Sequence, residues 1–115
     1  MSGKSPITTH VLDTSYGRPA RGVGVCLEKR IGQELVELAR GETDADGRVS
    51  DLLAPGALEP GIYRMTFGTS AYYEAAGLYC FYPNVQIDFR VDDAEQHYHV
   101  PLLLSPFGYS TYRGS

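Results

Sequence analysis

The sequence predicts an all-β fold, a two-sheet β-sandwich of about eight short strands with one short helix. Three observations predict it. Apolar and polar residues alternate with period two over most of the chain, turn-forming residues recur at short intervals, and one segment breaks the alternation. The same pattern also fits a small β-barrel. With 115 residues, 43% of them apolar, the chain can bury one core, so we expect a single domain over residues 1–115.

The strands are expected where the alternation is regular. It is clearest in Val85–Val91, and Val23–Glu28 and Ile62–Phe67 follow the same rule. Further strands are expected at Ile7–Leu12, Glu34–Arg40, Arg48–Leu53, Tyr98–Leu104 and Gly108–Tyr112. Turn chemistry separates the strands at Tyr16–Pro19, Asp44–Gly47, Ala54–Gly56, Glu59–Gly61 and Asp92–Asp93.

The segment Ser70–Gly77 lacks this alternation and predicts a helix of two turns. Ser70 is a candidate N-cap, Glu74 is an acidic residue early in the helix, and Gly77 is a stop signal. So short a helix needs support from the sheets.

Composition excludes several classes of function. The net charge of −4 argues against a nucleic-acid partner, and no apolar run approaches the ~20 residues of a membrane span. The first residues lead into a strand without a secretory apolar region, so we expect a cytoplasmic protein. In that compartment Cys26 and Cys80 are expected to be free thiols that serve packing.

The histidines are the first candidates for chemistry, because the chain has only three. His97 and His99 are two apart on an expected strand and therefore share a face. With His10 they could form a three-histidine zinc site, act in acid–base catalysis, or be structural. His10 shares its strand face with Thr8, and such a polar face suits a solvated cleft, an interface or plain surface. The residues alone leave these alternatives open.

Arg48 and the last residues are further candidates. Arg48 follows the Asp44–Gly47 turn, and its guanidinium could bind a carboxylate or urea-like group, or lie free in water. The closing stretch carries Tyr109, Tyr112 and Arg113, which is unusual for a chain end and suggests part of a site. The sequence contains neither a Gly-x-Ser-x-Gly elbow nor a phosphate-binding glycine loop. The Asp44–Gly47 turn lacks the later glutamate of a calcium loop.

Several segments together resemble the transthyretin-like family. They are Ile7–Asp13, Gly17–Ala20, Thr43–Arg48, His97–Pro106 and Tyr112–Ser115. The Tyr-Arg-Gly-Ser of the last segment is similar to the enzyme branch, the 5-hydroxyisourate hydrolases, rather than to the thyroid-hormone carriers. The resemblance implies a homotetramer, a dimer of dimers, whose central channel holds a purine-derived substrate without a metal or cofactor.

The resemblance also implies residue roles and a reaction. The implied catalytic residues are His10, Arg48, His99 and Ser115, and the implied substrate-binding residues are His10, Arg48, Tyr112 and Arg113. His97 has a supporting role. The implied reaction is hydrolysis of 5-hydroxyisourate to 2-oxo-4-hydroxy-4-carboxy-5-ureidoimidazoline in urate catabolism, by histidine-activated water with arginine stabilisation. The alternative is a transthyretin-like carrier that binds a ligand without catalysis.

Overall fold

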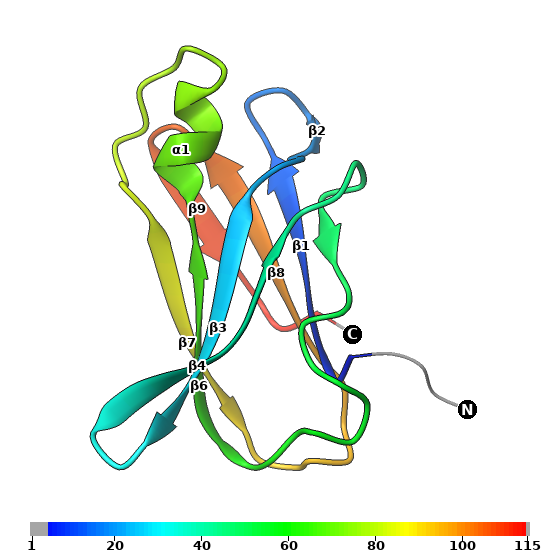
Figure 1. The fold of residues 1–115 in the computed structure, drawn as a ribbon. Helices are drawn as coiled ribbons and strands as arrows, with labels where there is room; N and C mark the ends of the chain where they lie inside the picture. The colour runs from blue at the N-terminus through cyan, green and yellow to red at the C-terminus, as the bar shows by residue number, and fades with distance from the viewer. Residues whose placement is uncertain (1–4, 115) are drawn as a thin grey trace.

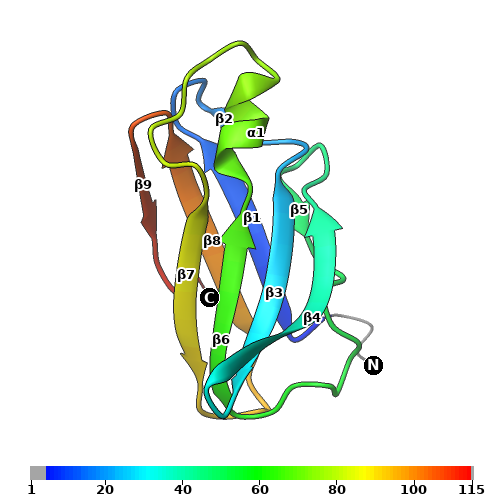
Figure 2. The same cartoon turned by 60° about the vertical axis from the view of Figure 1, so that its left-hand side comes forward.

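The computed structural model describes residues 5–114 as two β-sheets packed face to face, with a short helix at one end of the sandwich (Figures 1 and 2). The all-β, two-sheet prediction is confirmed. In chain order the elements are β1 (Ile7–Asp13), β2 (Arg18–Pro19), β3 (Gly24–Ile31), β4 (Glu34–Glu42), β5 (Arg48–Val49), β6 (Gly61–Phe67), α1 (Thr69–Glu74), β7 (Val85–Val91), β8 (Tyr98–Ser105) and β9 (Gly108–Thr111).

The two sheets differ in how their strands are connected. The first has the order β2-β1-β8-β9, with β5 also paired to β1, and the second has the order β4-β3-β6-β7. The pairs among these strands are antiparallel except β1 and β8, which run parallel from Ile7 opposite Tyr98 to Asp13 opposite Leu104. The first strand of the chain is therefore joined to one of the last.

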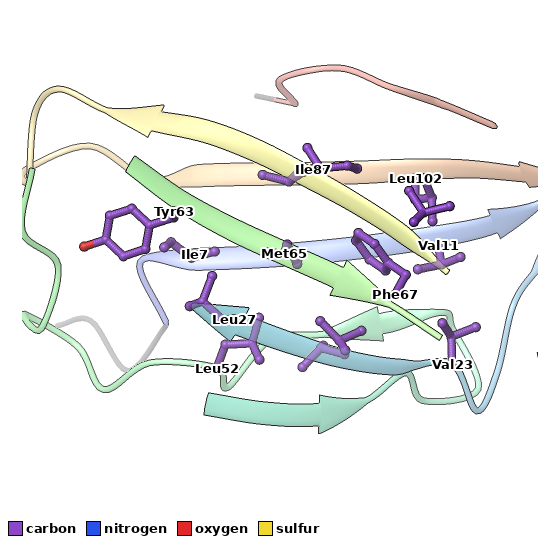
Figure 3. Close-up of a cluster of buried hydrophobic side chains, with 14 of the residues drawn as sticks. Ile7, Val11, Val23, Leu27, Leu52, Tyr63, Met65, Phe67, Ile87 and Leu102 are labelled. Carbon is purple, nitrogen blue, oxygen red and sulfur yellow. The ribbon is translucent and has the colours of Figure 1, made fainter. Parts of the chain in front are cut away.

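The core lies between the sheets and follows the alternation in the sequence. Figure 3 shows Ile7, Val11 and Leu102 from the first sheet facing Met65 and Phe67 from the second, and all five are 0% exposed. Burying a side chain of this size stabilises the fold by about 1.5–3 kcal/mol. These residues fix which face of each strand points outward.

Several strand predictions were wrong in their extent, and β3 and β4 run beyond their expected ends to Ile31 and Glu42. The expected strand Arg48–Leu53 ends at Val49, because β5 pairs with β1 only through Thr9 and His10. Leu52 is buried all the same, from the loop that follows. The expected turn Tyr16–Pro19 contains the two-residue strand β2, which pairs with the end of β1. The last strand stops one residue before the expected Tyr112.

The helix prediction was correct in kind but wrong at its start. The helix covers Thr69–Glu74, and its N-cap is Gly68 rather than Ser70. The Ser70 hydroxyl instead donates to Glu74 Oε2 at 3.2 Å. The stop signal is confirmed, because Gly77 has a φ of +75° and donates its N–H to the Glu74 carbonyl at 2.9 Å.

A buried carboxylate fastens the helix to the first sheet. Asp13, at the end of β1, is 0% exposed and accepts hydrogen bonds from the Tyr72 hydroxyl at 2.7 Å and the Tyr73 hydroxyl at 3.0 Å. It also accepts from the backbone N–H and hydroxyl of Ser15. Burial opposes the charge on Asp13, but these bonds hold its pKa below the ordinary value, so the group is ionised. Burial, with Asp13, raises the pKa of Tyr72 to about 12.

The expectation of free cysteines can be compared with the structure. Cys26 and Cys80 are both free. Cys80 packs in the core, whereas Cys26 is half-buried on the opposite face of β3 from Val25 and Leu27. Within residues 5–114, no helix has the length and apolar character needed to cross a membrane.

Candidate active site

Three strands of the first sheet place polar side chains on one outward face. On β1, Thr9 and Val11 point into the core, so Thr8 and His10 point outward and are half-buried. In the pairing register Arg48 of β5 lies opposite His10. His99 of β8 lies opposite Thr8. Residues paired across neighbouring strands share a face, so the structure brings these side chains together. We call this group, with His97, the histidine face: Thr8, His10, Arg48, His97 and His99.

The turn before β5 determines where Arg48 lies. Asp44 Oδ1 accepts the backbone N–H groups of Asp46 at 2.9 Å and Arg48 at 3.0 Å, and these bonds lower the pKa of Asp44. Gly47 has a φ of +76°, and a Cβ there would collide with the backbone oxygen of Val11. Gly47 therefore lets the turn pack closely against β1. Within residues 5–114 the Arg48 side chain makes no ion pair.

The histidine face keeps His99 neutral. Burial lowers the pKa of His99, and electrostatic repulsion, from Arg48 first and from the neighbouring histidines His10 and His97, lowers it further. A hydrogen bond with the Thr8 backbone acts in the opposite direction without reversing the shift. A neutral imidazole beside a fixed guanidinium can accept a proton while the arginine stabilises negative charge.

Sequence reasoning missed the role of Thr8. Its hydroxyl lies 2.9 Å from His97 Nε2 and 2.8 Å from His99 Nδ1, so it joins the two rings. The sequence contained one indication of this role, because Thr8 and His10 share a face of the expected strand. The parallel pairing that brings Thr8 to His99 has no signal in the local sequence.

The tail after β9 packs against His99. Gly114 donates its N–H to the His99 carbonyl at 2.8 Å. A Cβ on Gly114 would lie 2.5 Å from Cδ2 of the His99 ring, so only glycine fits there without displacement. Ser115, which is predicted to be catalytic, lies outside the described residues.

Arg113 lies beside the histidine face rather than in it. The Arg113 guanidinium stacks 4.4 Å from the Tyr98 ring centroid and donates to Gln96 Oε1 at 2.9 Å. Tyr98 and His99 are successive strand residues, so their rings lie on opposite faces of the sheet, and Arg113 is held on the Tyr98 side. Tyr112 is 57% exposed. A pocket of ≈ 290 Å³ lies between β7, β8 and the tail, and its lining includes Asp88, Arg90, Tyr98, His99, Tyr112 and Arg113.

The three histidines do not form a ligand set for a metal ion. Two of them, His97 and His99, are hydrogen-bonded to Thr8. Among residues 5–114, no three His, Cys, Asp or Glu side chains cluster in an arrangement that could hold a metal.

Comparison with known proteins links this geometry to one family. Residues 7–114 match the model of the HIUase/Transthyretin family. The chain is 49% identical over 115 residues to a 5-hydroxyisourate hydrolase of Caulobacter vibrioides, covering 96% of this chain and 99% of the relative. It is 45% identical over 113 residues to the 5-hydroxyisourate hydrolase of Mus musculus, covering 96% of each.

Solved structures give the same result for the fold. A 5-hydroxyisourate hydrolase from Klebsiella pneumoniae superposes with a TM-score of 0.83 at 40% identity, covering 95% of this chain and 98% of that one. Sea bream transthyretin in complex with thyroxine superposes with a TM-score of 0.91 at 30% identity, covering 96% of this chain and 95% of that one. The backbone is thus shared by both, whereas the sequence is more similar to the hydrolases.

Proposed function

The chain belongs to the HIUase/transthyretin family as a 5-hydroxyisourate hydrolase, and we propose that His10, Arg48 and His99 carry out its reaction. The reaction is the hydrolytic opening of 5-hydroxyisourate to 2-oxo-4-hydroxy-4-carboxy-5-ureidoimidazoline. The observation that carries the residue assignment is the convergence of these side chains from β1, β5 and β8 on one open face.

The mechanism follows from what the hydrolysis needs. A neutral histidine takes a proton from water, and the hydroxide oxygen adds to the ring carbonyl carbon. The carbonyl oxygen becomes an oxyanion, which the Arg48 guanidinium stabilises. The C–N bond of the ring then breaks, and a protonated histidine gives its proton to the leaving nitrogen. His10 and His99 divide these two transfers, and the lowered pKa of His99 supports the role of base at neutral pH.

The tail forms a wall of the substrate site. Tyr112 and Arg113 bind substrate from the pocket side, where both line the ≈ 290 Å³ pocket together with His99. Ser115 orients one of the histidines, as the third member of a catalytic triad does. Deleting residues 112–115 should abolish turnover and leave the thermal melt of the sandwich unchanged. A truncated chain with full activity would remove the tail from the site.

The active protein is a single transthyretin-like domain assembled as a cytoplasmic homotetramer, a dimer of dimers. Exposed aromatic side chains support an assembly, because Tyr79 and Phe107 are each 69% exposed and their ring centroids lie 6.0 Å apart. The two free cysteines suit a reducing compartment. Light scattering on the purified protein measures the mass, and a monomer at all concentrations would contradict the assembly.

Stopped-flow absorbance of freshly made 5-hydroxyisourate tests the function. We expect its decay to accelerate in proportion to enzyme concentration, with the same rate when a metal chelator is present. The alternative function is that of a carrier. The backbone supports it, because sea bream transthyretin superposes on this chain with a TM-score of 0.91. Saturable binding of an aromatic ligand without faster decay of 5-hydroxyisourate would favour the carrier.

A further inference from the structure

The histidine face contains a hydroxyl group that the reaction as described does not use. Thr8 Oγ1 lies between two ring nitrogens, 2.8 Å from His99 Nδ1 and 2.9 Å from His97 Nε2. Thr8 is half-buried on β1, next to His99 in the parallel register. Both distances are those of full hydrogen bonds.

Counting protons limits what the three groups can do. A threonine hydroxyl has one proton to donate and two lone pairs to accept with. The two ring nitrogens therefore cannot both be acceptors, so at least one of them carries a proton. A neutral histidine has one protonated and one bare nitrogen, and the state of Nδ1 therefore decides whether Nε2 can accept a proton from water.

The surroundings of His99 place its proton on Nδ1. The ionisable groups that act on the ring are Arg48 from β5, His10 from β1 and His97 from the segment just before β8, and none of them can carry a negative charge. Among residues 5–114, no carboxylate, the usual orienting group of a catalytic histidine, acts on the His99 ring. Thr8 offers acceptors instead, through its hydroxyl and through a backbone hydrogen bond that favours the protonated ring.

We propose that Thr8 is the positioning residue of His99. Its hydroxyl accepts the Nδ1–H of His99 and donates its own proton to His97 Nε2, which leaves Nε2 of His99 without a proton and able to accept one. His97 fixes the direction of the hydroxyl and so has a defined supporting role. The inference rests on the proposed function for its effect on catalysis, but the tautomer of His99 is independent of it.

The test compares Thr8→Val, which keeps the branched shape and removes the hydroxyl, with Thr8→Ser, which keeps the hydroxyl. Thr66→Val is the matched control, because Thr66 is a half-buried threonine near the end of β6 on the other sheet. We expect Thr8→Val to lower kcat by about 10- to 100-fold, the range for residues that orient metal-bound histidines, with little change in KM. Thr8→Ser and Thr66→Val should stay near the parent kcat.

Nitrogen-15 NMR of the histidine rings provides a readout that a merely structural role would not change. In the parent protein at neutral pH, we expect His99 to carry its proton on Nδ1. In Thr8→Val that preference should be lost, and in Thr8→Ser it should be kept. A parent protein with the proton on Nε2 of His99, or the same ring shifts in Thr8→Val, overturns the inference. If Thr8→Val fails to fold, the parent spectrum still decides.

The two hypotheses fail in different ways. If the parent protein does not consume 5-hydroxyisourate, the proposed function is wrong while the ring shifts still decide the role of Thr8. If the parent is active, His99→Ala is inactive and Thr8→Val retains full kcat, only the role of Thr8 is wrong.

Discussion

Gly114 packs against the imidazole ring of His99, so closely that a Cβ on the glycine would lie 2.5 Å from Cδ2 of the ring. The backbone bond from the Gly114 N–H to the His99 carbonyl, at 2.8 Å, holds the tail in that position. The position of the tail therefore depends on the His99 ring, and the position of the ring depends on the tail.

Gly114→Ala should displace the ring or the tail. A misplacement of about 1 Å can cost on the order of 100-fold in rate, so we expect kcat/KM to fall by about that factor with little change in melting temperature. Gly108→Ala is the control, since a Cβ there meets only Ser105 Oγ at 3.7 Å. Equal activity of the two variants would contradict the packing of the tail on His99.

Loss of either histidine should nearly abolish turnover. General acid–base groups contribute about 10²- to 10⁴-fold, so His10→Ala and His99→Ala should each reduce kcat within that range. Circular dichroism should show both variants folded, because both side chains are on the outward face of the sheet. Stopped-flow decay of 5-hydroxyisourate measures the rates. Near-parent turnover of His99→Ala would exclude it as a base.

The pKa of His99 should depend on Arg48. The lowered pKa means that His99 becomes protonated, and activity is lost, only as the pH falls below the ordinary value of about 6.5. Arg48→Gln removes a positive charge and should raise the pKa, whereas Arg48→Lys should hold it low. An NMR titration of His99 follows this directly. No difference between the two variants would mean that the charge of Arg48 does not contribute to the shift.

Asp13→Asn should destabilise the fold. The buried Asp13 carboxylate accepts four hydrogen bonds from three residues, and an amide would turn a donor group towards some of those donors. We expect a loss of about 1–3 kcal/mol in the free energy of unfolding, measured by urea denaturation. Asp92→Asn, at an exposed position, is the control. Because the pKa of Asp13 is lowered by folding, its contribution should be lost as the pH falls below about 4.

The sequence predicted the strands whose side chains alternate between core and solvent. Tyr63, Met65 and Phe67 are buried as the period-two pattern requires. The pattern failed where strands are defined by pairing over very few residues, as in β2 and β5. Ser70 was wrongly assigned as a cap because its identity suits that position, while its hydroxyl bonds to Glu74.

For the site, residue identity was more informative than geometry. His10, Arg48 and His99 could be named from the sequence and do share a face. Thr8 could not be assigned, because its partners are 89 and 91 residues away along the chain. Arg113 lies on the Tyr98 side of the sheet, which only the path of the tail determines.

The parallel pairing of β1 with β8 has a consequence for the order of folding. The hairpin of β3 and β4 joins near neighbours in the sequence, but β1 meets β8 across a span of 91 residues. Closing so long a loop is slow, because its entropy cost is offset only when the distant strand has paired. During synthesis, we expect the second sheet to form first, because β1 has no partner until β8 has been synthesised. Catalytic competence then follows the formation of the second sheet, because the histidine face needs both β1 and β8.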